Sequence, residues 1–468
     1  MKQTYYIKTV LTALATTAFM ACTESYPTMI LEETKANIHD LNSDSTANRT
    51  PVLLFINQQD LFTVTATRGM GEFPPEDLSK YSKGAVYIYA FRDGRNTQGE
   101  LTSYADLTKS AYATGYPHDP DFADCLIDGD DYTLGLRTFV RPGSSGELKY
   151  TAEDLKEDTL ITYDQIMDHV CYYSDRHQEA PYNFFAYYID ELDKNRVLNS
   201  NVHRTRDSIW YDISIDGTQD IMCGMAPPLK DVLDTWYPNQ NKRLSDNERS
   251  VIRNGYSKFS ADRDIHPYIR MEHQLTQLKF KIYPGDATAD DIVIQKIEVL
   301  FRHNGHMTIA TQDPSKSKPK VWFDGTPDWG NLNFPTEDLE FPVDESGNKI
   351  DVGGYTVKWD KNAKGEWYDQ SSKDVGRGLI LPCDTIYEMR IHYKQKAAKK
   401  EGSPKEWSFS KISQKNIELN DDVKNKWFQP GQRYVISIAV FGQKGIQVYT
   451  AFEKWKDGGS TEVVDDGW

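Results

Sequence analysis

Short runs of alternating apolar and polar side chains are the main pattern in this chain, and they predict β-strands. The clearest run covers residues 85–91 (AVYIYAF), in which Val86, Ile88 and Ala90 fall on one face of an extended segment. The turn signal Asp93-Gly94 follows directly. Tyrosine is the commonest aromatic residue, with 28 copies, and aromatic residues favour strands, so we expect β-structure to dominate.

The same alternation recurs at Tyr182–Tyr188, Leu278–Ile282 and Tyr434–Val440. Helical spacing is scarce, and we expect short helices only at residues 163–173 and 248–254. Many short strands separated by turn residues favour a mainly β protein made of sandwiches.

Two long segments, 112–158 and 310–375, are rich in Gly, Pro, Asp and Ser and therefore predict surface loops. The chain is long enough for two or three domains of about 150 residues each. We place a boundary just after the 278–282 strand, which gives an N-terminal domain over 51–286 and a C-terminal domain over 287–468.

The N-terminus has the pattern of an export signal. Lys2 and Lys8 precede an uncharged run from Thr9 to Met20, which is too short to span a bilayer that needs about 20 residues. Residues 1–21 therefore predict a signal peptide. Cys22 at the first mature position predicts a lipoprotein, in which that thiol is lipidated.

An ordinary signal peptide with an incidental Cys22 is the alternative, because Phe19 stands where Leu is commoner in lipoprotein signals. Residues 22–50 are polar, with Pro27 and several Ser, Asn and Asp. We expect a tether between the lipid and the first domain.

The formal charge of the chain is −16, and the signal segment contributes two lysines and no acid, so the mature chain is still more acidic. Such a surface repels phosphate backbones, and we expect no nucleic-acid partner. No later stretch is apolar enough to predict a transmembrane helix.

Besides Cys22 the chain has Cys125, Cys171, Cys223 and Cys383. Four cysteines in an exported protein permit three pairings, and their spacing does not choose among them. The spacing matches no metal-ligand pattern, and isolated buried thiols are an equal alternative to disulfides.

Few residues suggest a metal-binding site. His303 and His306 would share one face of a helix, but Gly305 and the β pattern predict a turn. The acidic cluster 128–131 (DGDD) lacks the further ligands and the bidentate Glu of a calcium loop, so we interpret it as a solvated loop. We expect no metal site.

Catalytic motifs are missing from the sequence as well. The chain has no Gly-rich phosphate loop and no nucleophile elbow, so we expect neither a cofactor nor an enzyme. Any two carboxylates might form a glycosidase pair, with Trp322, Trp329 or Trp359 as sugar platforms or core residues, but the sequence does not select them. His273 and Trp455 are expected to be structural.

Several segments, in this order, resemble the fimbrillin family, the lipoprotein-derived type V pilin subunits of anaerobic Gram-negative bacteria. The resemblance covers residues 86–459 behind the signal. Its segments are VYIYAF at 86–91, FFAYY at 184–188, MEHQLTQLKFKI at 271–282, GLILP at 378–382, PGQRY at 430–434, 445–452, and Trp455 with Gly458-Gly459.

This resemblance implies two transthyretin-like β-sandwich domains with long loops and a few short helices. It implies a structural or adhesive subunit of a cell-surface fimbria, carried to the outer membrane by its lipid. An arginine-specific protease would then remove the first strand, and a strand from another fimbrial subunit would fill the groove. A host protein or glycan would be the adhesion ligand.

Two arginines are candidates for that cut. Arg68 follows an expected strand at 62–66 and lies in a Gly-containing segment, which suits proteolysis. Arg49 is followed two residues later by Pro51, which stiffens the chain. We prefer Arg68, and for each arginine the alternative is an exposed side chain without processing.

Two other functions stay open at this point. The first is a surface lipoprotein that binds glycans and supports polysaccharide capture, and the second is an exported glycoside hydrolase. A concave row of exposed aromatic rings would indicate the former. Two carboxylates roughly 5–10 Å apart in a cleft would indicate the latter.

Overall fold

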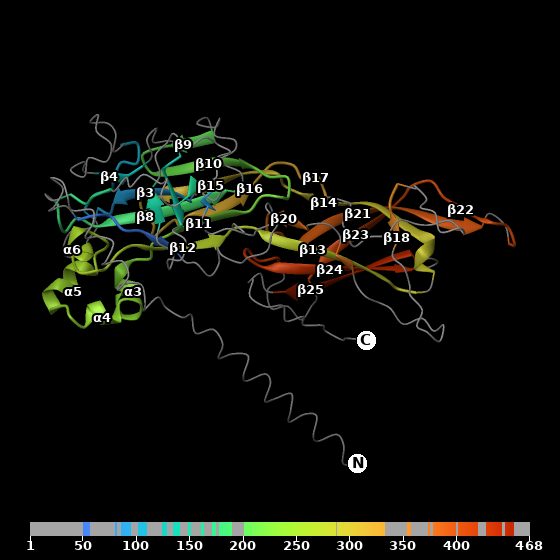
Figure 1. The fold of residues 1–468 in the computed structure, drawn as a ribbon. Coiled ribbons are helices and arrows are strands. Elements are labelled where there is room, and N and C mark those ends of the chain that lie inside the picture. The colour runs from blue at the N-terminus through green and yellow to red at the C-terminus, as the bar shows by residue number, and fades with distance from the viewer. Residues whose placement is uncertain are drawn as a thin grey trace, which may run out of the picture.

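The computed structural model describes residues 50–56, 80–81, 86–94, 102–109, 124–128, 134–140, 148–150, 161–162, 171–174, 177–189, 201–286, 288–332, 353–356, 373–374, 378–398, 401–419, 427–441 and 445–453. Over these residues the chain is mainly β and forms an elongated molecule with one group of sheets at each end (Figure 1).

An eight-stranded sheet forms the centre of the first group, at the left of Figure 1. Its order is β1-β12-β11-β8-β3-β5-β6, with β4 paired to β3 beside that path. The strands are β1 (Phe55–Ile56), β3 (Val86–Arg92), β4 (Cys125–Ile127), β5 (Leu136–Val140), β6 (Leu148–Tyr150), β8 (Tyr182–Ile189), β11 (Ile221–Met225) and β12 (Tyr268–His273).

A four-stranded sheet packs on one face of this sheet, in the order β16-β15-β10-β9. A separate pair, β2 with β7, is antiparallel. The strands are β9 (Val202–Arg204), β10 (Ser208–Ser214), β15 (Asn304–Thr311), β16 (Lys320–Phe323), β2 (Lys80–Tyr81) and β7 (Ile161–Thr162).

Short helices cover the opposite face, at the lower left of Figure 1. They are α3 (Leu229–Trp236), α4 (Pro238–Asn241), α5 (Asp246–Ile252) and α6 (Lys258–Ala261). Ser245 caps the start of helix α5: its hydroxyl accepts from the Glu248 backbone N–H, while the Glu248 carboxylate accepts from the Ser245 N–H. This reciprocal cap satisfies two backbone donors at the helix start.

Strands β3 and β8 are buried on both faces. In β3, Val86 and Ile88 enter the core beneath the helices, whereas Tyr87 and Tyr89 enter the core shared with the four-stranded sheet. The Tyr87 ring stacks on Tyr187 of β8, with 5.4 Å between ring centroids. The alternation seen in the sequence therefore separates two cores rather than a core from solvent.

The second group consists of a five-stranded and a six-stranded sheet, packed face to face. The first has the order β19-β13-β24-β25 with β20 on β13; the second has the order β17-β14-β21-β22 with β18 on β14 and β23 on β21. The strands are β13 (Thr276–Pro284), β14 (Ile292–Phe301), β17 (Asp328–Asn331), β18 (Tyr355–Thr356), β19 (Lys373–Asp374), β20 (Leu379–Leu381), β21 (Ile386–Ala398), β22 (Lys405–Trp407), β23 (Lys411–Glu418), β24 (Arg433–Phe441) and β25 (Gly445–Glu453), and the 3₁₀ helix η5 (Ala289–Asp291) precedes β14.

One hydrophobic core runs through both groups without a break. At the junction the Ile380 backbone N–H donates to the Gly217 carbonyl, at 2.8 Å, so β20 packs on the turn after β10. Where β12 leads into β13, His273 Nδ1 lies 2.7 Å from Asp220 Oδ2, and both side chains are buried. These contacts tie the two groups together, and His273 has the structural role expected from the sequence.

The expected mainly β fold with packed sheets is confirmed. All four expected strands occur: residues 86–91 of the first run lie in β3, and the other three runs lie within the longer strands β8, β13 and β24. The expected helix at 248–254 corresponds to α5, which covers 246–252.

Other expectations were wrong or incomplete. The expected loops contain β4–β6 and β16–β19, which are too short and too interrupted by turn residues to show an alternating pattern. Residues 171–173 are not helical, because Tyr172 forms a β-bridge with Pro51. Helices α3, α4 and α6 were missed.

The domain limits stay a prediction, although β13 pairs with late strands and β15 with β10. Among the described residues, no helix has the length and hydropathy needed to cross a membrane.

Burial on both faces of β8 predicts that adjacent large side chains are equally important. Phe184 and Phe185 point into different cores, and neither is exposed. We expect Phe184→Ala and Phe185→Ala each to lower the free energy of unfolding by about 3–5 kcal/mol in urea titrations. The exposed control Lys320→Ala should change it by less than about 0.5 kcal/mol. A cost below about 1 kcal/mol for either phenylalanine would contradict two-sided burial.

Candidate functional site

The described structure begins with an extended segment, residues 50–56, that contacts both ends of the eight-stranded sheet. On one side β1 pairs with β12 in parallel, and the Phe55 N–H donates to the Pro267 carbonyl at 3.0 Å. On the other side the Leu148 N–H of β6 donates to the Leu54 carbonyl at 2.9 Å. The segment therefore protects two edges whose backbone groups need hydrogen-bond partners.

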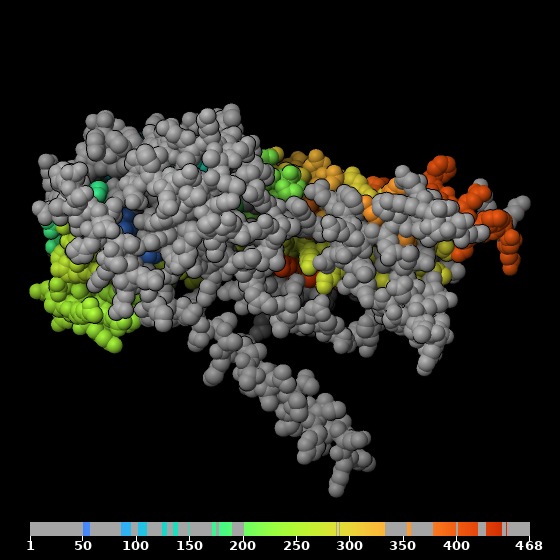
Figure 2. Space-filling model, viewed as in Figure 1, coloured from blue at the N-terminus to red at the C-terminus, as the bar shows by residue number. Residues whose placement is uncertain are grey.

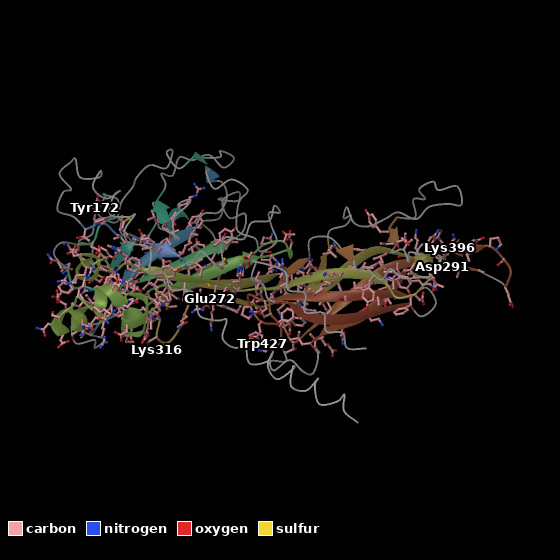
Figure 3. The ribbon with its side chains drawn as sticks, turned by 60° about the horizontal axis from the view of Figure 1, so that its bottom comes forward. Tyr172, Glu272, Asp291, Lys316, Lys396 and Trp427 are labelled. Carbon is pink, nitrogen blue, oxygen red and sulfur yellow. The ribbon has the colours of Figure 1, made fainter. Side chains whose placement is uncertain are left out.

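Residues 171–173 provide a third contact. The Val52 N–H donates to the Cys171 carbonyl at 2.7 Å, and the Tyr173 N–H donates to the Thr50 carbonyl at 3.0 Å. These two hydrogen bonds form a β-bridge in which Pro51 lies opposite Tyr172, which is labelled in Figure 3. The backbone of the segment is thus held by β6, β12 and residues 171–173.

Alternate side chains of the segment fill the core beneath the helices. Val52, Leu54 and Ile56 are fully buried there, and Phe55 is only 5% exposed. Burial of one such side chain stabilises the fold by about 2 kcal/mol. The segment is therefore a plug as well as an edge, and its removal would leave an apolar slot. We call residues 50–56 the edge plug.

The walls of the slot are apolar in character even where they carry titratable groups. His266 lies beside Phe55, with 6.3 Å between ring centroids, and burial lowers the pKa of His266 to about 4. Burial raises the pKa of the Tyr173 and Tyr256 phenols well above the usual value. These groups are neutral at physiological pH, so the slot suits an uncharged strand rather than an ionic ligand.

Sequence reasoning missed these plug residues, although a signal was present. The unbroken run Val52–Ile56 (VLLFI) has the composition of a strand buried on both faces. It starts where the polar tether was expected to end. At its start, the Thr50 hydroxyl donates to Asp262 Oδ1 at 2.5 Å, which anchors the entry to the plug.

The expected lipidation and processing residues lie outside the described residues. These are Cys22, Arg49 and Arg68, and the expected strand at 62–66 and Trp455 also lie outside. In sequence, however, Arg49 stands immediately before the edge plug and Arg68 stands after it. A cut at the first would leave the plug in the mature chain, and a cut at the second would separate it.

The two histidines noted in the sequence take part in separate contacts: His303 lies in the tight β14–β15 turn, and His306 lies in β15. His303 Nδ1 lies 2.9 Å from the Ile215 carbonyl oxygen. His306 joins two carboxylates, with Nδ1 2.7 Å from Asp212 Oδ1 and Nε2 3.1 Å from Asp324 Oδ2. The expected turn is confirmed. Within the described residues, no cluster of three or more His, Cys, Asp or Glu could hold a metal ion.

The acidic cluster contradicts the expected solvated loop at its first residue. Asp128 is fully buried and forms an ion pair with Arg204, 3.4 Å between Oδ2 and Nη2, while residues 129–131 lie outside the described part. The guanidinium also lies over Tyr89 and Phe91, 5.8 and 5.4 Å from their centroids. A buried carboxylate needs such a partner, which the local sequence does not reveal.

All four cysteines after Cys22 are thiols in the structure. Cys125, Cys171 and Cys223 are buried, and burial raises the pKa of Cys223. Cys383 is half-buried, and burial raises its pKa to about 12. The Cys223 and Cys383 thiols are therefore protonated at physiological pH, which lowers their reactivity as nucleophiles.

The C-terminal strand β25 lies at an edge of the five-stranded sheet. It pairs with β24 in antiparallel register from Arg433↔Glu453 to Phe441↔Gly445. The side chain of Ile446 is buried. Unlike the edge plug, this strand has a single described neighbour in its sheet.

No family model and no curated protein matches the chain. Among solved structures, it is similar to one from Bacteroides uniformis described as a "putative cell adhesion protein", with 11% identity and a TM-score of 0.39 over 88% of this chain and 100% of that one. It is also similar to two proteins of Porphyromonas gingivalis. The tip fimbrial protein Mfa3, truncated at its C-terminus, has 9% identity and a TM-score of 0.30 over 86% and 99%. The fimbrial anchor protein Mfa2 has 10% identity and a TM-score of 0.27 over 86% and 98%.

These neighbours are of the class to which the sequence resemblance points. Because the identities and TM-scores are this low, the roles of these proteins are not transferred to the chain.

The His306 contacts predict a pH-dependent contribution to stability. Partial burial lowers the pKa of His306, but hydrogen bonds to Asp212 and Asp324 outweigh it, so the net shift is upward. The stabilisation is therefore complete below the ordinary value of 6.5 and is lost as pH rises through the raised pKa. In urea titrations His306→Gln should cost more at about pH 5.5 than at about pH 9.

Asp324→Asn, which leaves Asp212 in place, should reduce this pH difference. An equal cost of His306→Gln at both pH values would show that the charged form of His306 adds nothing.

Proposed function

We propose that this protein is a structural or adhesive subunit of a cell-surface fimbria, without enzymatic activity. One observation carries the proposal: the edge plug, which lies between two candidate arginine cut sites, is the apolar element that fills the slot and protects both sheet edges. A subunit that releases this element exposes a site that another strand can enter.

The physics of that step follows from the contacts. Loss of residues 50–56 would leave Leu148 and Tyr173 N–H groups without their carbonyl partners, and the edge of β12 without β1. The slot would also expose the core that Val52, Leu54 and Ile56 now fill. Unpaired edge groups beside an apolar slot are a template for strand addition, and another fimbrial subunit would supply the strand.

Of the two arginines, Arg68 is the proposed cut site. A cut after Arg68 places the whole edge plug in the released leader, whereas a cut after Arg49 leaves the plug covalently attached to the mature chain. Only a cut after Arg68 opens the slot. This reason from the structure adds to the sequence preference for Arg68.

The proposed route to the surface depends on the N-terminus. Residues 1–21 direct export, and lipid on Cys22 holds the precursor at the outer membrane through the tether of residues 22–50. The precursor is thus lipid-anchored, and after processing the mature chain leaves its anchor and enters the fimbria. Its partners are other fimbrial subunits.

Polysaccharide capture for uptake, the alternative from sequence, expects a row of exposed aromatic rings. Tyr104, Trp322, Phe409 and Trp427 are the exposed aromatic side chains of the described residues, and they belong to four different segments. Trp329, another sequence candidate, is covered by the Arg390 guanidinium at 3.8 Å. Fimbrial assembly therefore accounts better for the described surface.

Cleavage of the purified full-length precursor by an arginine-specific protease tests the proposal. We expect a new N-terminus at Gly69 and a ladder of oligomers that resists mild SDS, because the emptied slot accepts a strand from another copy. Arg68→Gln should abolish both the cut and the ladder, and the matched Arg49→Gln should abolish neither. N-terminal sequencing and gel electrophoresis give the two readouts. A complete cut after Arg68 with only monomer remaining would refute polymerisation by this route.

The anchor is tested separately in cells by metabolic labelling with a fatty acid. We expect the precursor to carry the label and to fractionate with the outer membrane. Cys22→Ala should remove the label, because the thiol is the acceptor. Persistent labelling of that variant would show that Cys22 is not the lipidation site.

A further inference from the structure

A cleft of about 470 Å³ lies between the eight-stranded sheet and the β15–β16 loop. Strands β8, β11 and β12 contribute its floor, and the start of α3 with residues 253–256 forms the wall opposite the loop. Helices α3–α6 are the yellow-green surface at the lower left of Figure 2, and Glu272 of the floor is labelled in Figure 3. Ligand pockets commonly have volumes of roughly 300–1,000 Å³. We call this site the loop cleft.

The floor lies on the face of β12 opposite the core that the edge plug fills. Ile269 and Met271 enter that core, whereas Arg270 and Glu272 alternate with them and line the cleft. The middle strand of the floor, β11, is paired on both sides, with β8 and with β12. An extended peptide therefore cannot add to β11 as a strand, and recognition has to come from side chains.

An exposed ion pair on the floor presents a donor and an acceptor side by side. Arg270 Nε lies 3.4 Å from Glu272 Oε1, and the two side chains are 54% and 64% exposed. A guanidinium only donates hydrogen bonds and a carboxylate only accepts them, whereas a hydroxyl does both. Neighbouring hydroxyl groups of a sugar ring therefore match this pair. Met225, opposite Arg270 in the strand pairing, offers an apolar surface to the C–H groups of the ring.

Hydrogen bonds hold both walls of the loop cleft. In the β15–β16 loop, the Asp313 carbonyl accepts from the Lys316 N–H at 3.0 Å and from the Ser317 N–H at 3.1 Å. On the other side the Ala226 N–H donates to the Phe184 carbonyl at 2.9 Å, which fixes the link between β11 and α3. The cleft is therefore formed before a ligand arrives, which reduces the entropy lost on binding.

The charge of the lining is close to balanced. Four basic and three acidic residues line the cleft, although the chain as a whole carries −16. One of the basic residues, Arg253, is paired with Asp234, with 3.4 Å between Nη2 and Oδ2. Because neither sign dominates, the cleft does not select a charged ligand by long-range attraction.

We infer that the loop cleft binds a short neutral saccharide, with adjacent hydroxyl groups on Arg270 and Glu272 and an apolar ring face against Met225. Its volume suits a few sugar rings at the end of a glycan, rather than the long chain that polysaccharide capture requires. The inference names a ligand class for the adhesive role and so rests on the proposed function, but it uses no residue of the edge plug or of the processing site.

Calorimetric titration of the purified full-length precursor with maltotriose, mannotriose and triacetylchitotriose tests the inference, with sialyllactose as the charged probe. We expect at least one of the neutral saccharides to bind, with an affinity that changes by less than about twofold between about 0.1 M and 0.5 M NaCl. The double variant R270A/E272A should bind roughly tenfold or more weakly, because it loses two hydrogen bonds to charged groups. The matched control R302A/D384A removes an exposed ion pair elsewhere and should bind within about twofold of wild type.

Unchanged melting temperatures show that both double variants fold, as expected for exposed positions. Binding of none of the three neutral saccharides, or equal losses in the two double variants, overturns the inference. Tighter binding of sialyllactose, or a tenfold loss of affinity over the same salt range, overturns the neutral class. If R270A/E272A binds saccharide normally but forms no protease ladder, the cleft receives a neighbouring subunit instead. Saccharide binding is measured on the uncut precursor, so its failure is distinguishable from failure of the proposed assembly.

Discussion

Burial of β3 and β8 on both faces is the constraint from which the rest of the architecture follows. Because neither face of these two central strands is exposed to solvent, each face requires a covering layer. The four-stranded sheet covers one side, and the helices together with the edge plug cover the other. Because β1 of the plug pairs with β12 at one end of the eight-stranded sheet and the Leu54 carbonyl accepts from β6 at the other end, the plug is also the element that both edges share. A seven-residue segment thereby completes a core and protects two edges at once.

Under the proposed processing, this arrangement would allow a stable fold to contain a removable part. The plug lies at the periphery of the sheet, so the central pairing of β3 with β8 does not depend on it. Its side chains nevertheless reach the interior, where Leu54 and Ile56 are fully buried. Under that proposal, release of the plug would open one slot and leave the core shared by the two sheet groups intact. An element in the middle of the sheet could not be exchanged without unfolding the protein.

Much of the fold was predictable from local pattern, and much of the candidate site was not. Strands β3, β8, β13 and β24 are long enough to show alternation, and Ser245 with Glu248 marks α5. Short strands such as β4 carry too few residues for a period to appear. The spacing of Leu229, Val232 and Leu233 after Pro228 indicated α3 but was overlooked. Asp128 gave no local sign of its partner Arg204, because that contact depends on tertiary folding.

The parallel pairing of β13 with β24 has a consequence for the order in which the chain acquires its structure. Gln277 and Arg433 lie side by side, and 156 residues separate them in sequence. Contacts between residues this distant in sequence form slowly, because the entropy of closing a long loop is lost before the contacts contribute their favourable energy. The five-stranded sheet therefore cannot form until almost the entire chain has been synthesised. In the proposed export from the N-terminus, this end of the chain would therefore stay unfolded during translocation, which is the state that translocation requires.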